Sequence, residues 1–196
     1  MTRLFRLARD DDAAAIASIY APSVTERSTS FELVPPDAAE MARRLEAVRR
    51  QYPWLVCETA DGVAGYAYAT AHRDRAAYRW SVDVSTYIAE SAQRQGIARA
   101  LYSRLFSILV LQGYRSAYAG ITLPNPASVE LHKAMGFREV GIYHGVGYKF
   151  GRWHDTMWLG CAIAEHSVDP AEPIALPVLF GEPKSKAAID AILAAD

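Results

Sequence analysis

The sequence predicts an α/β protein built on a mixed, largely antiparallel sheet that is flanked by helices. Short runs of alternating apolar residues, typical of strands, are interspersed with segments whose apolar residues recur at helical spacing. In chain order these segments follow the pattern β-α-α-β-β-β-α-β-α-β-β, which is typical of a sheet covered by helices. The 196 residues are enough to bury one ordinary core.

The first half of the chain is predicted to contain two helices and a hairpin. Residues Leu4–Leu7 form a short strand, and a helix follows with aspartates at its start and Pro22 after its end. Asp37 caps a second helix, which Tyr52-Pro53 stops. Asp61-Gly62 separates two alternating apolar runs, which is a strong signal for a hairpin turn.

The second half is predicted to alternate strands and helices. A strand in "WSVDVSTYI" leads to a polar loop and then to a helix, whose apolar positions from Ile97 to Leu109 repeat up to Gly113. After a strand in "YRSAYAGITL", Asn125 and Pro126 take the N-cap and first-turn positions of a helix that stops at Gly136. Two strands follow in "FREVGIYHGVGYKFGRWHDTMWLGCAI".

Two parts of unequal size are expected along the chain. Residues 1–165 carry all the predicted strands and form one domain. Residues 166–196 are a Pro-rich extension with one short, Ala-rich helix. No internal repeat is present in the sequence.

Composition argues against several classes of function. The formal net charge of -1 gives no basic surface for nucleic acid or for an anionic membrane. The N-terminus lacks the apolar core of a signal peptide, and no stretch approaches the roughly 18 apolar residues that span a bilayer. Cys57 and Cys161 lie in apolar runs and are interpreted as buried residues, not as a disulfide or metal ligands. We expect a soluble, cytoplasmic protein without a metal site.

The loop from Gln93 to Ala98 is a candidate phosphate site. A loop that runs from a strand into a helix offers unpaired N–H groups at the positive end of the helix dipole. Gly96 lets the backbone approach a ligand closely, although a glycine here could also simply ease the turn. No Gly-Lys-Ser/Thr follows and no G-x-G-x-x-G is formed, so the P-loop and the dinucleotide fingerprint are excluded.

The pattern Gln93-x-x-Gly96-x-Ala98 resembles the pyrophosphate loop of the GCN5-related N-acetyltransferases (GNAT), which use acetyl-coenzyme A (acetyl-CoA). The next helix also keeps this family's offsets, with His132 where a Tyr is usual. The residues at these offsets are Asn125, Ser128, His132, Gly136 and Phe137. The resemblance implies the GNAT fold and acetyl-CoA as the co-substrate.

Several stretches resemble one branch, the phosphinothricin and methionine sulfoximine N-acetyltransferases. They are "YPWLV", "VAGYAYA", "RQGIARALY", "LPNPASVELHKAMGF" and "GYKFGRWHD", spread between Leu4 and Leu159. By this resemblance, a defined set of residues is expected to contact acetyl-CoA: Tyr87, Ile88, Gln93, Arg94, Gln95, Gly96, Ile97, Ala98, Arg99, Asn125 and Ser128.

Asp83 and His132 are the candidate catalytic residues. Asp83 lies in an alternating apolar strand, where an unpartnered carboxylate is costly to bury, so it is either functional or part of a structural ion pair. The branch typically carries Glu in this segment, and Asp83 is one methylene shorter. His132 is either an acid or base near the thioester sulfur or a buried core histidine. Tyr102, one turn after Ala98, is assigned to the core.

The resemblance also implies residues that contact the amino-acid substrate. They are Phe31, Arg73, Arg75, Tyr78 and Tyr87. In the branch, two basic residues meet the acidic groups of the substrate, and Arg73 and Arg75 occupy the matching segment. The alternatives are a solvated charged loop for the two arginines and ordinary core packing for the aromatic residues.

The leading hypothesis is acetylation of the α-amino group of a small glutamate analogue, of the phosphinothricin, methionine sulfoximine or arsinothricin type. Acetylation of another small amine or of a peptide N-terminus is a second hypothesis, and a non-catalytic acyl-CoA sensor is a third. The presence of both Asp83 and His132 counts against the sensor. A homodimer is expected by resemblance, with the loop around Tyr78 and the C-terminal strands near the interface.

Overall fold

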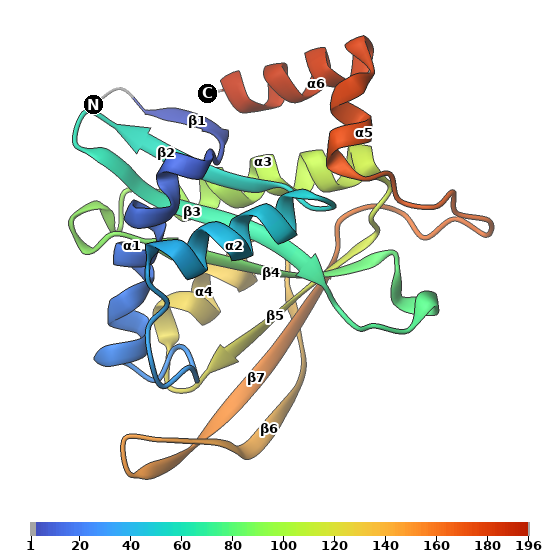
Figure 1. The fold of residues 1–196 in the computed structure, drawn as a ribbon. Coiled ribbons are helices and arrows are strands. Elements are labelled where there is room, and N and C mark those ends of the chain that lie inside the picture. The colour runs from blue at the N-terminus through green and yellow to red at the C-terminus, as the bar shows by residue number, and fades with distance from the viewer. Residues whose placement is uncertain (1–2, 196) are drawn as a thin grey trace.

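A seven-stranded sheet organises the described part of the chain, residues 3–195 of a computed structural model (Figure 1). The strand order is β1-β2-β3-β4-β5-β7-β6. All neighbours are antiparallel except β4 and β5, which are parallel. The strands are β1 (Leu4–Leu7), β2 (Trp54–Thr59), β3 (Gly62–Ala71), β4 (Ser81–Ile88), β5 (Ser116–Thr122), β6 (Arg138–Lys149) and β7 (Arg152–Ala162). The predicted mixed, mostly antiparallel sheet is confirmed.

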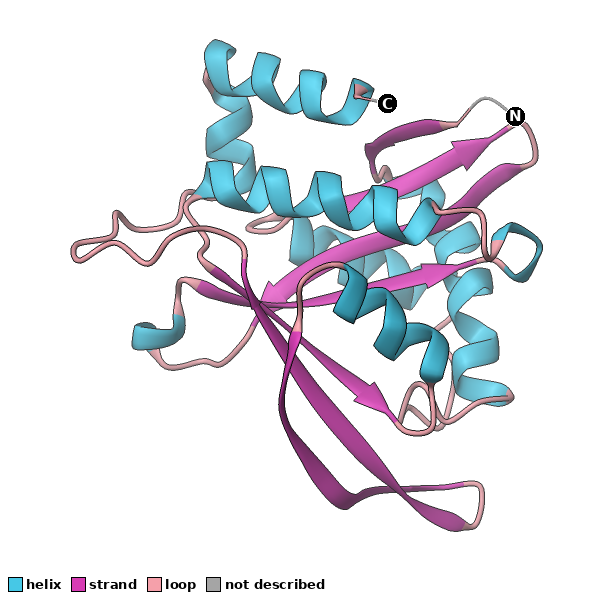
Figure 2. Cartoon of the chain, turned by 180° about the vertical axis from the view of Figure 1, so that it is seen from behind, coloured by secondary structure: helices cyan, strands magenta, loops and turns pink. Residues whose placement is uncertain are grey.

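Helices cover both faces of this sheet. The helices are α1 (Ala13–Thr25), α2 (Ala38–Arg49), α3 (Ile97–Gln112), α4 (Pro126–Ala134), α5 (Leu176–Gly181) and α6 (Pro183–Ala194). Helices α1 and α2 lie on the face seen in Figure 1, and α3 and α4 lie on the opposite face, seen in Figure 2. Short 3-10 turns at Asp10–Asp12, Ala76–Tyr78 and Glu90–Ala92 complete the connections.

Local capping explains where several helices begin and end. The Asp37 carboxylate accepts a hydrogen bond of 2.8 Å from the backbone N–H of Glu40 at the start of α2. The Asn125 side chain accepts one of 3.2 Å from the N–H of Ser128 at the start of α4. Gly113 ends α3 with a φ of 100°, a left-handed conformation that favours glycine.

The predicted end of the first helix at Pro22 is wrong. Helix α1 continues to Thr25, with Pro22 inside it. Proline lacks the N–H that would bond one turn back, but a helix can absorb one lost bond close to its end. The N–H of Glu26 still bonds the Pro22 carbonyl at 3.1 Å, so the last turn closes behind the proline.

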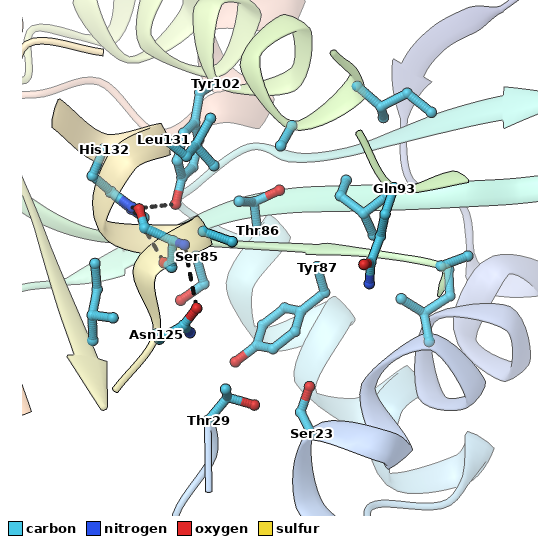
Figure 3. A pocket seen from close by; sticks show the side chains of 18 of the residues that line it. Ser23, Thr29, Ser85, Thr86, Tyr87, Gln93, Tyr102, Asn125, Leu131 and His132 are labelled. Atoms are coloured by element: carbon cyan, nitrogen blue, oxygen red, sulfur yellow. Dashed lines mark hydrogen bonds between the residues drawn. The ribbon is translucent and has the colours of Figure 1, made fainter. Parts of the chain in front are cut away.

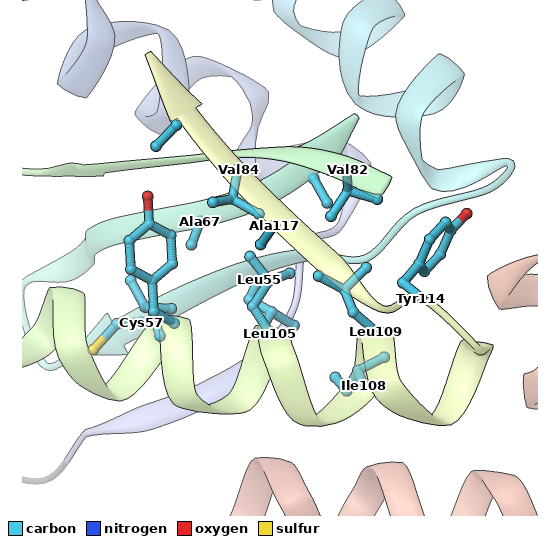
Figure 4. Close-up of a cluster of buried hydrophobic side chains, with 14 of the residues drawn as sticks. Leu55, Cys57, Ala67, Val82, Val84, Leu105, Ile108, Leu109, Tyr114 and Ala117 are labelled. Atoms are coloured by element: carbon cyan, nitrogen blue, oxygen red, sulfur yellow. The ribbon is translucent and has the colours of Figure 1, made fainter. Parts of the chain in front are cut away.

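The hydrophobic core has two parts, one on each face of the sheet. On the α3 face, Leu105, Ile108 and Leu109 are fully buried, and α3 packs against β2, β3 and β4 (Figure 4). On the other face, α1 and α2 cover an aromatic group in which the Trp54 ring stacks on Tyr66 and Tyr68. Burying each large aliphatic side chain contributes about 1.5–3 kcal/mol, so the two layers hold the sheet between them.

The C-terminal segment contains two helices where the sequence predicts one short helix. Pro183 stands in the first turn of α6 and starts a second helix directly after α5. Leu176, Leu179 and Ile189 are buried in the same cluster as α3, and α6 contacts both α3 and β1. The segment therefore adds to the core instead of standing apart from it, and the boundary at residue 165 stays a prediction.

The two parallel strands separate part-way along their length. Their pairing covers only Ser81–Asp83 of β4 and Ser116–Tyr118 of β5. Beyond this point β4 stays paired with β3 up to Ile88, and β5 stays paired with β7 up to Thr122. The diverging strands are visible in Figures 1 and 2. The sheet is thereby split, and backbone groups on the facing edges of both strands are left without a strand partner.

Candidate active site

A cavity of about 790 Å³ lies between the diverging ends of β4 and β5. Its walls come from β4, the loop that leads into α3, the first turns of α3, the end of β5, and α4. Residues near the end of α1, including Ser23 and Thr29, close the remaining side (Figure 3). Unpaired strand edges and two helix starts therefore meet in one space.

The loop into α3 has the geometry of an anion site. Gly96 is the N-cap of α3 and has a φ of 78°, and Arg94 also has a positive φ, of 58°. A Cβ built on Gly96 would meet no atom within 4 Å, so the backbone faces open space. The first N–H groups of α3 have no partner inside the helix and stand at its positive end. This arrangement suits a phosphate, with Arg94 and Arg99 lining the same cavity.

The structure brings together the expected cofactor residues, with one exception. The residues that line the cavity are Tyr87, Ile88, Gln93, Arg94, Gly96, Ile97, Ala98, Arg99, Asn125 and Ser128. Gln95 is not among them. Its side chain donates to the Ser91 carbonyl at 3.1 Å, and Arg3 donates to the Gln95 carbonyl at 2.9 Å. Gln95 therefore bonds within the loop and to the N-terminal segment.

His132 lies in the cavity wall, and its hydrogen bonds define its tautomer. Nδ1 lies 2.7 Å from the carbonyl oxygen of Ser128, so Nδ1 must carry a proton. Burial lowers the pKa of His132, so the ring is neutral and Nε2 holds a lone pair. The Tyr102 hydroxyl, 3.1 Å away, donates to that lone pair (Figure 3). In this state His132 is a hydrogen-bond acceptor and has no Nε2 proton to give.

Tyr102 belongs to the site as well as to the core. It is fully buried among core residues, as expected, and it also lines the cavity with its hydroxyl on His132. Burial raises the pKa of Tyr102, which keeps the phenol protonated and able to donate. The sequence signal for a place in the site was the position of Tyr102 one turn after Ala98, on the same face of α3 as the end of the Gln93–Ala98 loop.

Asp83 lies where the pairing of β4 with β5 ends, just outside the cavity lining. Its Oδ1 is 2.6 Å from Nδ1 of His72, the residue that follows β3. Burial raises the pKa of the Asp83 carboxyl, and the hydrogen bond to His72 opposes that rise. Asp83 is therefore one half of a carboxylate–imidazole pair, and nothing in the sequence pattern indicated its partner.

The expected substrate residues do not form one cluster within the described chain. Tyr87 lines the main cavity, with its ring edge-on to Tyr20. Phe31 lies against His154 instead. Arg73, Arg75 and Tyr78 line a second cavity, of about 470 Å³, beside the loop before β4.

The two arginines have different surroundings. The Arg73 guanidinium lies 5.3 Å from the centre of the Trp158 ring, and its charge opposes the rise that burial causes in the pKa of the Asp83 carboxyl. Arg75 is exposed at the start of the turn Ala76–Tyr78. Only Arg73 is thus placed beside the carboxylate–imidazole pair.

The described residues form neither a metal-binding cluster nor a membrane-spanning helix. Within residues 3–195, no group of three or more His, Cys, Asp or Glu side chains is arranged to hold a metal ion. None of the described helices has both the length and the apolar character needed to cross a membrane.

Comparison with known proteins decides the family. The profile of the acetyltransferase (GNAT) domain matches residues 5–158. This chain belongs to the GNAT acetyltransferase family. It is therefore an N-acetyltransferase, as the motif in the loop before α3 predicts.

Similar proteins place the chain in the expected branch. The phosphinothricin N-acetyltransferase of Alcaligenes faecalis is 44% identical over 154 residues, which are 78% of each chain. The L-methionine sulfoximine/L-methionine sulfone acetyltransferase of Salmonella typhimurium is 34% identical, over 85% of this chain and 98% of its own. The crystal structure of a phosphinothricin acetyltransferase from Sinorhizobium meliloti, in complex with acetyl-CoA, superposes with a TM-score of 0.83. It is 37% identical and covers 90% of this chain and 97% of its own.

Proposed function

We propose that this GNAT enzyme transfers the acetyl group of acetyl-CoA to the α-amino group of a small, acidic glutamate-like amino acid. The main observation behind the proposal is the cavity between β4 and β5. At this cavity, the start of α3, which suits a phosphate, lies together with unpaired strand edges near Asp83. Similar proteins are named as acetyltransferases of phosphinothricin or of methionine sulfoximine, and these names support a small amino-acid analogue as the substrate.

The loop before α3 holds the cofactor in this proposal. Backbone N–H groups from Gly96 to Arg99 face the pyrophosphate, and Arg94 and Arg99 supply positive charge. Asn125 lies at the start of α4, across the cavity, where it can contact the pantetheine arm. Backbone N–H groups of β4 between Thr86 and Ile88 face the cavity edge and stabilise the oxyanion that forms on the acetyl carbonyl.

The amine attacks the thioester directly, without a covalent enzyme intermediate. Burial raises the pKa values of both Cys57 and Cys161, and neither cysteine lines the cavity, so neither supplies a ready thiolate. An α-amino group is mostly protonated at neutral pH, so a base must first remove one proton. Asp83, at the apex of the split sheet, is the group proposed for this step, directly or through one water.

Tyr102 and His132 act on the departing sulfur. His132 accepts the Tyr102 hydroxyl and so fixes its orientation in the cavity wall. We place the hydroxyl close to the leaving thiolate, where it can turn from Nε2 and donate a hydrogen bond to sulfur. His132 therefore contributes through Tyr102 in this proposal, instead of donating a proton itself.

Arg73 and Arg75 are proposed to select the acidic side chain of the substrate. A guanidinium pairs with carboxylate or phosphinate oxygens in a bidentate manner. The position of Arg73 beside Asp83 would hold the substrate's acidic end while its amine faces the thioester. Phe31, Tyr78 and Tyr87 remain proposed as the aromatic walls of the substrate site.

A homodimer is proposed on a separate observation. Large apolar side chains are exposed along the hairpin formed by β6 and β7, at Tyr143 (52%), Tyr148 (59%), Phe150 (57%) and Trp153 (67%). Exposed apolar side chains that gather on one hairpin commonly mark interfaces. A second copy would cover them and could bring Arg75 and Phe31 toward the same site. Light scattering at micromolar concentration should give twice the 21.6 kDa chain mass, and a monomer mass would contradict the proposal.

The other functions considered from the sequence are acetylation of another small amine, acetylation of a peptide N-terminus, and acyl-CoA sensing without catalysis. A thiol-release assay with acetyl-CoA and a panel of amines separates them. Acidic amino acids should give the highest kcat/KM, and phosphinothricin, methionine sulfoximine and arsinothricin belong in the panel. Preference for a peptide N-terminus or a neutral amine would contradict the substrate class, and acetyl-CoA binding without turnover would indicate a sensor.

The unpaired cysteines are compatible with the expected cytoplasmic location.

A further inference from the structure

We propose that His72 is a catalytic residue, and that His72 and Asp83 accept the substrate's proton as one unit. This inference rests on the proposed amine acetylation, and it replaces Asp83 as the lone base by a carboxylate–imidazole pair. Nothing in the sequence motifs assigns a role to His72, which follows directly after β3.

The geometry holds the imidazole firmly on the carboxylate. Nδ1 of His72 lies 2.6 Å from Oδ1 of Asp83. The His72 ring stacks on Tyr118, with ring centres 4.3 Å apart and an angle of 18° between the planes. The rings of Tyr78 and Trp158 stand edge-on to it at 5.9 Å and 6.1 Å. Ring contacts on several sides leave His72 little freedom to leave Asp83.

The register of the sheet makes this contact possible. Thr70 pairs with Asp83 across β3 and β4, and Tyr118 pairs with Asp83 across β4 and β5. The side chain of His72, two residues beyond Thr70, projects from the same face of the sheet. His72, Asp83 and Tyr118 therefore meet where β4 and β5 begin to separate.

The hydrogen bond determines which nitrogen is free. A carboxylate only accepts, so Nδ1 carries the proton that lies between the two groups. Nε2 then holds a lone pair. It has no hydrogen-bond partner among residues 3–195, and 12% of the His72 side chain is exposed. A base with a fixed orientation and an unpaired lone pair is the arrangement that general-base catalysis requires.

An imidazole is a better match to the task than a short carboxylate. Histidine is the side chain that most often acts as a general base, because its neutral ring offers one nitrogen lone pair to the proton. The ring also extends the proton-accepting atom beyond the reach of Asp83. The other charged or titratable groups around the pair are Arg73, Tyr78 and Tyr118.

The proton balance of the step is simple. One N–H bond of the substrate ammonium breaks, and one N–H bond forms at Nε2 of His72, directly or through one water. The pair becomes an imidazolium bound to a carboxylate, and the neutral amine keeps the electron pair with which it attacks the thioester carbonyl. After transfer, Nε2 returns its proton to solvent.

Two substitutions at His72 separate a base from a merely positioning side chain. His72→Asn keeps an N–H donor for Asp83 but cannot take up a proton. His72→Phe keeps the stacked ring but forms no hydrogen bond with Asp83 and accepts no proton. Both should lower kcat by roughly 10²–10⁴-fold, the usual contribution of a general base, and activity should recover in part as pH rises. His166→Asn, which alters a histidine bonded to Ser116, is the matched control and should keep wild-type kcat.

The acetyl-CoA affinity of each variant, measured by calorimetry, reports whether its fold and cofactor site are intact. Wild-type kcat and an unchanged pH profile in His72→Asn would overturn the inference while leaving the proposed function standing. If the wild type turned over nothing on the amine panel, the proposed function itself would fail.

The pair has a second readout that does not depend on turnover. The ring-nitrogen NMR shifts of neutral His72 should show one tautomer in wild type, with the proton on Nδ1, and a mixture of tautomers in Asp83→Ala, because the carboxylate holds the proton on Nδ1. The same tautomer mixture in both proteins would overturn the coupling between the two residues.

Discussion

The proposed cofactor side and the proposed substrate side of this enzyme are built in different ways. The proposed cofactor residues come mostly from one continuous stretch, from Tyr87 to Arg99, and from the start of α4. The proposed substrate residues come from the loop after α1, the loop before β4, and β4 itself, and Phe31, Arg75 and Tyr87 lie in separate places. Local backbone geometry suffices to build the first side, whereas the second depends on long-range packing and, as proposed, on a second copy.

A short sequence pattern therefore predicts a site well only where local backbone geometry builds that site. A glycine at an N-cap and an Asn cap fix the direction of their helices within a few residues, so the motif and the geometry coincide. A substrate pocket has no such local rule. The following predictions test whether the two sides are as separate in function as they are in construction.

The largest effect is expected for Asp83→Asn. The amide cannot hold the His72 proton as a carboxylate does, so kcat should fall roughly 10²–10⁴-fold while acetyl-CoA affinity stays unchanged. Steady-state kinetics with saturating acetyl-CoA measures the first quantity, and calorimetry measures the second. A large loss of acetyl-CoA affinity would show that the two sides are coupled.

Tyr102→Phe should follow in size. The change removes the hydroxyl that His132 orients and leaves the buried ring in place, so the fold is retained. Loss of one hydrogen-bond donor at a developing charge costs about 10²–10³-fold in kcat. His132→Ala should have a smaller effect than Tyr102→Phe, because His132 works through the hydroxyl. The reverse order would make His132 the group that meets the sulfur.

Arg73→Ala and Arg75→Ala address the substrate side. A lost hydrogen bond to a charged group is worth about 1.5–3 kcal/mol, so KM for an acidic amino acid should rise by roughly tenfold or more. The KM for acetyl-CoA should not change in either variant. If Arg75→Ala leaves the KM for acidic amino acids at the wild-type value, we would abandon the glutamate-analogue substrate and test neutral amines.

The smallest effect is a shift in pH dependence. Burial raises the pKa of Asp83, and a base must be unprotonated to work, so kcat/KM should fall as pH decreases. The midpoint of this fall should lie above the usual Asp range of about 3.9. A profile that stays flat down to pH 4 would exclude the Asp83–His72 pair as the base. His132, whose pKa is lowered by burial, should add no limb near neutral pH.

The fold could be predicted largely because the residues that begin helices and form turns act locally. Asp37, Asp61-Gly62 and Asn125 each specify a cap or turn without reference to the rest of the chain. The continuation of α1 through Pro22 could not be predicted, because tertiary packing overrides the lost hydrogen bond. The two C-terminal helices gain their stability from packing on α3, which no local pattern reveals.

The layout of the candidate site was predictable only in part. The residues around Gly96 line the cavity together because the loop and helix form one continuous motif, and their role as a cofactor site stays a prediction. The partner of Asp83 was missed because His72 is 11 residues away and reaches it only through the register of β3 with β4. The core position predicted for Tyr102 is correct, but its contact with His132 was not predicted, because a buried tyrosine at helical spacing resembles any core aromatic until its hydroxyl is located.

The most direct test of the account compares acetyl-CoA binding by two valine variants. Gly96 and Gly62 both have positive φ, 78° and 103°, and a Cβ on either would meet nothing within 4 Å, but only Gly96 faces the cavity. Calorimetric titration should show Gly96→Val binding acetyl-CoA about tenfold more weakly or worse, since the branched side chain crowds the pyrophosphate and a lost hydrogen bond to a charged group costs about 1.5–3 kcal/mol. Gly62→Val, at the hairpin turn, should keep wild-type affinity. Equal affinities in folded Gly96→Val and wild-type protein would contradict the claim that this loop binds the cofactor.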